Sequence, residues 1–173
     1  MNKHSLIAAV EDALLQGLAL LDGLDSDTYS RTFEGASLGA HYRHVLDHFL
    51  CLKEGFRTGE VNYDLRTRDP RLENSAAYAR LVTQQLMDEF TALSPDTFER
   101  ECVVTYTVGY DEAEAGSVPS NLAREITFCV GHAIHHYAIL KLLCAGAGVK
   151  LPYEFGIAPS TLRHRENSAI HAS

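Results

Sequence analysis

Apolar residues recur at helical spacing in four separate segments of this 173-residue chain, and this periodicity limits the folds open to it. The first segment ends near Gly23, and its apolar side chains follow one another at steps of three or four residues: Leu6, Val10, Leu14, Leu18 and Leu21. Residues at these steps lie on one face of a helix. The segment is therefore predicted to be an amphipathic helix that buries this face.

Three further helices are predicted from capping residues and periodicity. Ser37 is the expected N-cap of the second helix, which ends at Gly55 or Gly59. The third helix is expected from about residue 75 to 93, and the fourth from Ser117 or Ser120 to about residue 144. Four amphipathic helices of this length form a four-helix bundle by default. We therefore predict an all-α fold, with residues 1–173 forming one domain.

The connections between these helices differ in character. Residues 60–74 lack helical periodicity and contain Pro70, which predicts a long polar connection. Residues 102–108 are rich in β-branched side chains and predict a short strand or extended segment, followed by an acidic loop around residues 111–114. The C-terminal residues 151–173 are expected to place an apolar patch on the bundle before a frayed end.

Composition excludes several classes of function. The chain is 46% hydrophobic and 22% charged, and it contains no apolar run long enough to span a membrane, so we expect a soluble protein. A formal net charge of −8 argues against non-specific binding of nucleic acid. The four cysteines form no CxxC pair, which favours reduced thiols and a cytoplasmic location.

Two histidine clusters carry the strongest functional signal. The first is HYRHVLDH, with His44 between His41 and His48, and the second is HAIHHY, in which His132 and His136 are four residues apart. Residues at that spacing share a helical face and can reach one ion. A third imidazole from the second helix would leave one coordination position open, as in catalytic zinc sites. Chance surface or core histidines remain the competing interpretation.

Other residues near these clusters are candidates for supporting roles. Asp47 can orient an imidazole by accepting its N–H, while His48, His135 and Cys129 can line the same cavity. Each has an ordinary alternative, such as a solvated helix charge for Asp47 and a packed core thiol for Cys129. In the connection after the second helix, Arg66 and Arg68 can bind an anionic substrate, although a solvated network of charges is equally compatible with that segment.

At these motifs the sequence resembles the DinB-like superfamily of metal-binding four-helix bundles, named for DNA-damage-inducible proteins. The resemblance covers nearly the whole chain and rests on SLGAHYRHVLDH and REITFCVGHAIHHYAILKLL, with a tail, EFGIAPSTLRH, that looks like that of an uncharacterised bacterial subgroup. It implies the DinB/YfiT-like metalloenzyme fold. It also implies that His44, His132 and His136 bind a divalent ion, with zinc and nickel expected first.

The resemblance also suggests an activity. Characterised members of the superfamily include enzymes that transfer or isomerise substrates with a low-molecular-weight thiol. Those transferases often contain HHRGQ where this chain has HHYAILKLL, so the motif does not identify the thiol. We therefore expect a metal-dependent thiol S-transferase acting on a small-molecule substrate. A metal-dependent hydrolase and a non-catalytic, metal-binding stress-response protein are the alternatives, and related bundles suggest a homodimer.

Overall fold

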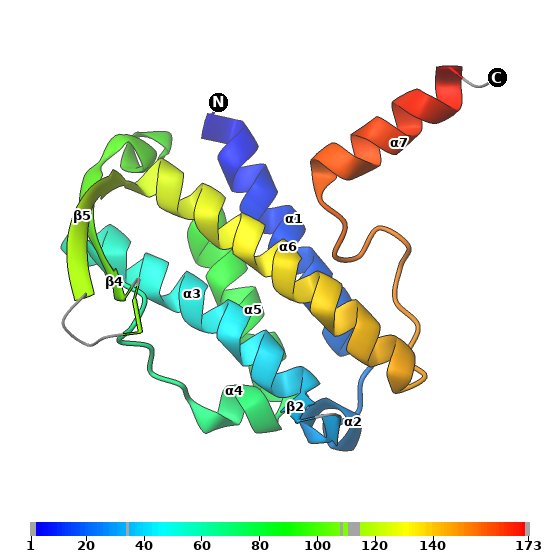
Figure 1. Ribbon diagram of the computed structural model, residues 1–173. Coiled ribbons are helices and arrows are strands. Elements are labelled where there is room, and N and C mark those ends of the chain that lie inside the picture. The colour runs from blue at the N-terminus through cyan, green and yellow to red at the C-terminus, as the bar shows by residue number, and fades with distance from the viewer. Residues whose placement is uncertain (1–2, 34, 108, 111–114, 172–173) are drawn as a thin grey trace.

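Four long helices lie side by side and form a bundle (Figure 1). The computed structural model describes residues 3–33, 35–107, 109–110 and 115–171. The long helices are α1 (Lys3–Asp22), α3 (Leu38–Thr58), α5 (Ala76–Thr91) and α6 (Leu122–Gly146). Helix α3 packs against α5 and α6, and α1 packs against the same two helices. The predicted all-α four-helix bundle is confirmed, and a small sheet is added to it.

The centre of the bundle contains tyrosines whose hydroxyl groups are hydrogen-bonded. Tyr42 of α3 and Tyr137 of α6 are fully buried, with their ring centroids 6.4 Å apart. The hydroxyl of Tyr42 lies 2.7 Å from that of Thr83 on α5, and Tyr137 donates to the backbone carbonyl of Ala13 on α1. Since burying an unpaired hydroxyl is costly, these bonds allow large side chains with polar ends in the core.

Short elements connect the long helices, and Ser37 caps α3 as predicted. The backbone N–H of Ala40 donates to the Ser37 hydroxyl at 2.9 Å. The short helices are α2 (Ser26–Ser30), α4 (Pro70–Asn74) and the 3₁₀ helix η1 (Pro95–Glu99). Strands β1 (Thr32–Phe33) and β2 (Ala36–Ser37) pair just before α3. The second helix thus begins and ends where the sequence predicted, with Gly59 as its C-cap.

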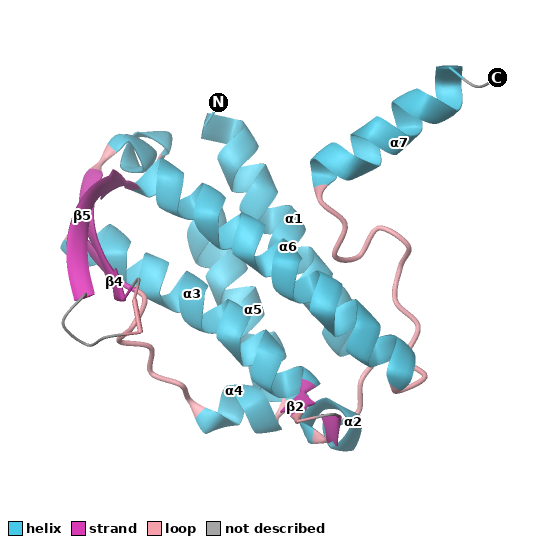
Figure 2. Ribbon diagram, viewed as in Figure 1, coloured by secondary structure: helices cyan, strands magenta, loops and turns pink. Residues whose placement is uncertain are grey.

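A three-stranded sheet covers one end of the bundle (Figure 2). It contains β3 (Glu60–Asn62), β4 (Glu101–Thr107) and β5 (Ala115–Asn121), with β4 in the middle. Strand β3 is parallel to β4, whereas β5 is antiparallel to it. The predicted extended segment is therefore β4. The acidic residues 111–114 expected after it lie outside the described residues.

Two predictions about this region were wrong. Residues 60–74 are not a plain connection, because they contain β3 and α4. The fourth helix begins at Leu122 with Asn121 as its N-cap, because Ser117 and Ser120 lie in β5. The helix begins later than predicted because residues 115–121 pair with β4, a contact between distant parts of the chain. Pro119 is tolerated within β5 because β5 is an edge strand.

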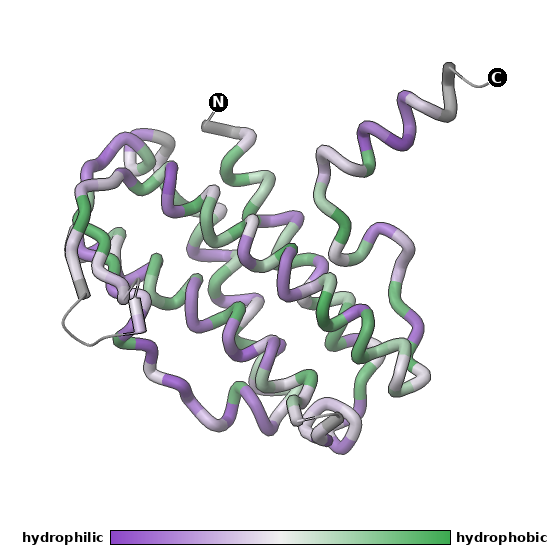
Figure 3. Tube along the Cα trace, viewed as in Figure 1, coloured by the Kyte–Doolittle hydropathy of each residue, from purple (hydrophilic) through white to green (hydrophobic). Residues whose placement is uncertain are grey.

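The C-terminal segment has two different parts. Phe155 is buried and its ring centroid lies 5.1 Å from that of Tyr137, which agrees with an apolar patch on the bundle. The end that follows was expected to fray but forms α7 (Pro159–His171), a mostly hydrophilic helix that projects from the bundle (Figure 3). Helix α6 is long and apolar enough to span a membrane by length and composition, two properties that the core helices of bundles share.

Candidate metal centre

Antiparallel packing of α3 and α6 brings the two histidine clusters together. At one end, the Nδ1 atoms of His41 and His136 are 3.3 Å apart. One helical turn along α3, the Nε2 atoms of His44 and His132 are 3.0 Å apart. The helical spacing within each cluster and the pairing of the two helices therefore place imidazoles from distant parts of the sequence at one location.

His44, His132 and His136 form a group able to hold a metal ion. Each offers a ring nitrogen, and these three atoms lie within 4.8 Å of one another. In a tetrahedral zinc site, two imidazole nitrogens at ordinary bond lengths are about 3.3 Å apart. The separation of 3.0 Å between His44 and His132 is close to this value. The donor set therefore fits a divalent ion after small side-chain adjustments, and three protein ligands leave a position for another molecule.

The same three imidazoles are held in their neutral form. Burial is the main cause, and it lowers the pKa of His44 to about 3 and those of His132 and His136 to about 4. The neighbouring imidazoles lower these pKa values further. Metal ligation requires an unprotonated ring nitrogen. The site is therefore ready to bind a cation at neutral pH without first losing protons.

His48 lies beside the three histidines. Its ring is nearly fully buried, and its centroid is 4.1 Å from that of His132 and 5.3 Å from that of Tyr63. Its Nδ1 lies 2.8 Å from the backbone carbonyl of His44, so Nδ1 carries the proton that it donates there. In the neutral ring, Nε2 of His48 is then unprotonated and keeps its lone pair. The structure thus brings His48 to the cluster, as the sequence suggested.

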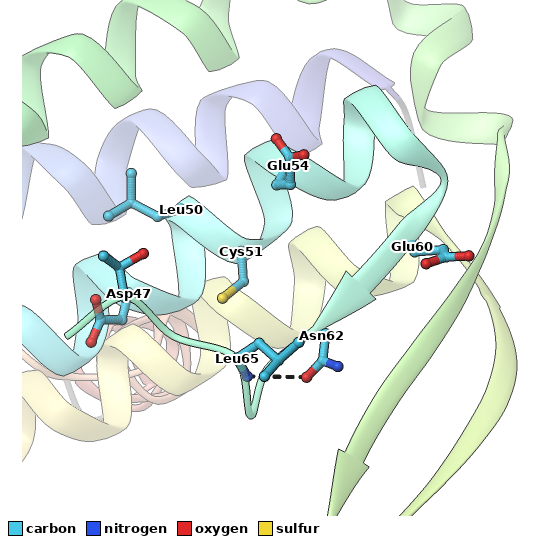
Figure 4. Close-up of a pocket in the computed structure, with 8 residues that line it drawn as sticks. Asp47, Leu50, Cys51, Glu54, Glu60, Asn62 and Leu65 are labelled. Atoms are coloured by element: carbon cyan, nitrogen blue, oxygen red, sulfur yellow. Dashed lines mark hydrogen bonds between the residues drawn. The ribbon is translucent and has the colours of Figure 1, made fainter.

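Asp47 makes a different contact from the one expected. Its Oδ2 accepts from Arg43 at 2.8 Å, and its Oδ1 has no hydrogen-bond partner among the described residues. Burial raises the pKa of Asp47, while Arg43 opposes this shift. Asp47 faces a separate cavity of about 240 Å³, which Cys51 and Leu65 also line (Figure 4). Within the part of the chain that the structure describes, Asp47 makes no bond to an imidazole, so the orienting role stays a prediction without support.

Cys129 is a packed core thiol. It is 1% exposed, and its Sγ lies 3.5 Å from the hydroxyl of Tyr63. Burial raises the pKa of Cys129 to about 12, so it stays protonated at neutral pH. The Tyr63 hydroxyl also donates to Glu125 at 2.9 Å. This arrangement makes Cys129 part of the wall behind His48 rather than a nucleophile.

The remaining candidates occupy different environments. His135 is exposed, with its ring centroid 5.5 Å from that of His136. Arg66 is half-buried and lines a cavity with His48, and its charge lowers the pKa of His44, His48 and His132. Arg68 is exposed and has a positive φ of 51°. The sequence offered Arg66 and Arg68 as equal candidates, but in the structure they differ in burial, and only Arg66 is half-buried.

His41 is a site residue whose role the sequence left open, between a surface residue and one beside the ligands. It is half-buried and contacts His136 through Nδ1 atoms 3.3 Å apart. At that distance, one of the two Nδ1 atoms can donate a hydrogen bond to the other, which places His41 directly beside a proposed ligand. The available signal was its spacing of three residues from His44. That spacing could not show which residue of the fourth helix it meets.

Comparison with known proteins agrees with the fold. No family profile matches the chain. A crystal structure of a DinB-like protein, YjoA of Bacillus subtilis, is similar to it with a TM-score of 0.63; the match covers 89% of this chain and 99% of that one. The two sequences are 16% identical, so this likeness shows a shared fold alone. The chain therefore has a DinB-like fold, and a three-histidine cluster within it that is compatible with metal binding.

A relative in sequence is much longer than this chain. FK506-binding protein 5 of Rhizopus delemar is 37% identical over 107 residues, which are 60% of this chain and 27% of that protein. The chain thus spans about a quarter of the length of this curated relative. FK506 binding, which the name records, is a property of that protein.

Proposed function

We propose that the protein binds one divalent metal ion through His44, His132 and His136, and that it is an enzyme of the thiol S-transferase type. The observation that carries this proposal is the meeting of Nε2 atoms from α3 and α6 at 3.0 Å, with His136 beside them. Zinc and nickel are the ions we expect first, because both accept imidazole ligands. The DinB-like fold supports this placement of ligands on facing helices.

A bound divalent ion in this site would lower the pKa of a thiol or a water molecule that reaches it. In the transfer reaction that we propose, a thiol R–SH and an electrophile R′–X give R–S–R′ and HX. The sulfur forms the new bond to carbon, X leaves with the bonding electrons, and the thiol proton ends on X. The chain itself contributes three neutral imidazoles and a partly dehydrated environment for the thiol.

Access to the site favours a catalytic role over a sealed one. His44 and His136 line an open cavity of about 270 Å³ together with His41, Ala36 and Ala40. The small alanine side chains leave room in front of the imidazoles. A small molecule can therefore approach the proposed ligands from solvent, which a metal used for stability alone would not need.

Two other functions use the same ligands. A hydrolase would use water in place of the thiol, and a non-catalytic stress-response protein would bind metal without turnover. We place the protein in the cytoplasm, as one domain that acts on a small molecule and forms a homodimer, and we propose no nucleic-acid or membrane partner. These assignments rest on composition and on the resemblance to DinB-like proteins.

Dependence of ligand binding on metal tests the proposal. We expect a small thiol to bind zinc-loaded protein at least about 10-fold more tightly than metal-free protein, as measured by titration calorimetry. His132→Ala should remove this difference, whereas exposed His135→Ala should keep it. Turnover of a test electrophile without added thiol would favour the hydrolase. Metal binding with no metal-dependent thiol binding would contradict the transferase.

A further inference from the structure

A second cavity lies beside His48, whose ring contacts those of His44 and His132. It has a volume of about 260 Å³, and we call it the His48 cavity; its wall includes His48, Asp64, Arg66, Tyr106, Arg124 and Phe128. The His48 ring contacts the His132 ring with a centroid separation of 4.1 Å. One imidazole therefore separates this cavity from a proposed metal ligand. His48 therefore belongs both to the wall of this cavity and to the histidine cluster.

Arg66 gives the His48 cavity a positive charge that no direct ion pair neutralises among the described residues. Its guanidinium is half-buried and makes no hydrogen bond or ion pair with any residue in the described ranges. Asp64, the acidic residue on the wall, accepts instead from the hydroxyl of Thr107 at 2.9 Å. The charge of Arg66 is felt by His44 and His132, whose pKa values it lowers. Arg66 thus lies on the cavity wall with His48, and its charge reaches two of the three histidines.

The other arginine on the wall is already paired. Arg124 donates to the buried carboxylate of Glu125 at 2.8 Å, and its guanidinium lies 5.4 Å from the centroid of the Phe128 ring. Its charge is therefore largely neutralised, and it closes the cavity mainly by its position. This leaves Arg66 as the residue with unused donors. Arg68, which the sequence offers as an equal candidate, is exposed and does not line the cavity.

The chemistry of the wall indicates the ligand. A guanidinium binds a carboxylate through two parallel hydrogen bonds, a geometry that an ammonium cannot offer. Phe128 and Tyr106 supply apolar surface beside it. The volume is below the range of about 300 to 1,000 Å³ that is usual for drug-sized ligands, so an amino-acid-sized group fits best.

We propose that the His48 cavity binds the carboxylate end of a small thiol, with Arg66 as the residue that recognises the carboxylate and places the sulfur towards the three histidines. This inference deepens the proposed function and rests on it in one respect, namely that the sulfur binds at the metal held by the three histidines. The recognition of the carboxylate rests on the cavity alone. The two parts can therefore be tested separately.

The test compares two thiols that differ in one group. For zinc-loaded wild type, ligand-observed NMR titration should give a dissociation constant for 3-mercaptopropionate at least about 10-fold lower than that for 3-mercapto-1-propanol. Arg66→Gln should remove this preference and leave the binding of the alcohol unchanged. Arg68→Gln is the matched control and should keep the preference. Equal binding of both thiols to wild type, or a preference that survives Arg66→Gln, would overturn the inference.

A thiol-free acid separates failure of this inference from failure of the proposed function. If neither thiol binds more tightly with zinc than without it, the proposed function fails, and 3-phenylpropionate is then titrated into the metal-free protein. Binding that is lost in Arg66→Gln but kept in Arg68→Gln would still support the carboxylate site. Absence of binding, or equal binding to both variants, would overturn it. Melting curves of both variants should match wild type, because neither arginine side chain has a hydrogen bond or ion pair to lose among the described residues.

Discussion

Gly39 allows the beginning of α3 to pack closely against α4. A Cβ at this position would collide with the backbone carbonyl oxygen of Glu73 and would also meet the ring of Tyr29. Gly131, in the middle of α6, has no atom within 4 Å of the same hypothetical Cβ. The two helical glycines therefore have different reasons to be present. Only the first is required by packing, and it lies in the turn of α3 that leads to the histidines.

Substituting these glycines should have opposite effects on stability. Gly39→Ala must push α3 and α4 apart, and we expect it to lower the free energy of unfolding by about 1 to 3 kcal/mol. Gly131→Ala should be neutral or raise it by up to about 1 kcal/mol, because alanine favours a helix. Urea unfolding of both variants measures the difference. Equal stabilities would contradict the close packing described for Gly39.

At the level of residues, spacing within one helix predicted more than contacts between helices. His132 and His136 were selected because residues four apart share a face, and Ser37 because a hydroxyl before an apolar run caps a helix. The contact between His41 and His136 depends on how two helices align, which periodicity does not specify. The choice of Arg66 over Arg68 depends on the path of the loop that contains them. Arg68 has a positive φ in this loop, and no sequence pattern predicted it.

Among the elements, α6 is joined to the sheet by a buried carboxylate. Glu125 is fully buried and accepts hydrogen bonds from the hydroxyls of Tyr63, which follows β3, and of Ser120 in β5. Arg124 provides a compensating positive charge. A buried carboxylate is tolerated only when its acceptors are satisfied. The network therefore fixes the first turn of α6 relative to the strands, next to His48.

Removing one donor from this network should destabilise the protein. Tyr63→Phe leaves Oε2 of Glu125 without its hydroxyl donor, and we expect a loss of about 1 to 3 kcal/mol in the free energy of unfolding. Ser117→Ala is the control, because its bond to Thr105 is exposed and its loss should cost less than about 0.5 kcal/mol. Chemical denaturation compares the two. A Tyr63→Phe protein as stable as wild type would show that the network does not hold these elements.

The long helices were predictable, whereas the sheet was predictable only in part. Residues 102–108 were recognised because β-branched side chains favour strands. Strand β3 has only three residues, too few for their alternation of polar and apolar side chains to stand out, and β5 contains Pro119, which argues against a strand in isolation. Both form because β4 supplies hydrogen-bond partners from elsewhere in the chain. Such non-local pairing overrides local signals, which also explains the late start of α6.

For the whole molecule, the low pKa values of the histidines couple folding to pH. Well above pH 6.5 the imidazoles are neutral in both folded and unfolded states and contribute nothing to this dependence. Between pH 6.5 and about 4, the unfolded chain binds protons that the folded site rejects, because burial holds the pKa values of His132 and His136 at about 4. Acidification through this window should therefore favour unfolding of the metal-free protein.

Thermal unfolding of the metal-free protein at pH 7 and pH 5 checks this coupling. We expect a lower Tm at pH 5, and a smaller drop in the variant His132→Gln/His136→Gln, which lacks two of the groups responsible. His135→Gln, an exposed neighbour, should behave as wild type does. A drop of the same size in the double variant would show that other groups control the pH dependence.

The metal content of the purified protein tests the central claim most directly. Protein made without a histidine tag should contain about one equivalent of a divalent metal by elemental analysis, or take up one equivalent of zinc or nickel. His44→Ala and His136→Ala should each lose this metal, whereas His135→Ala should retain it. A wild-type protein that neither carries metal nor can be loaded, or a His44→Ala variant that keeps a full equivalent, would contradict the three-histidine site.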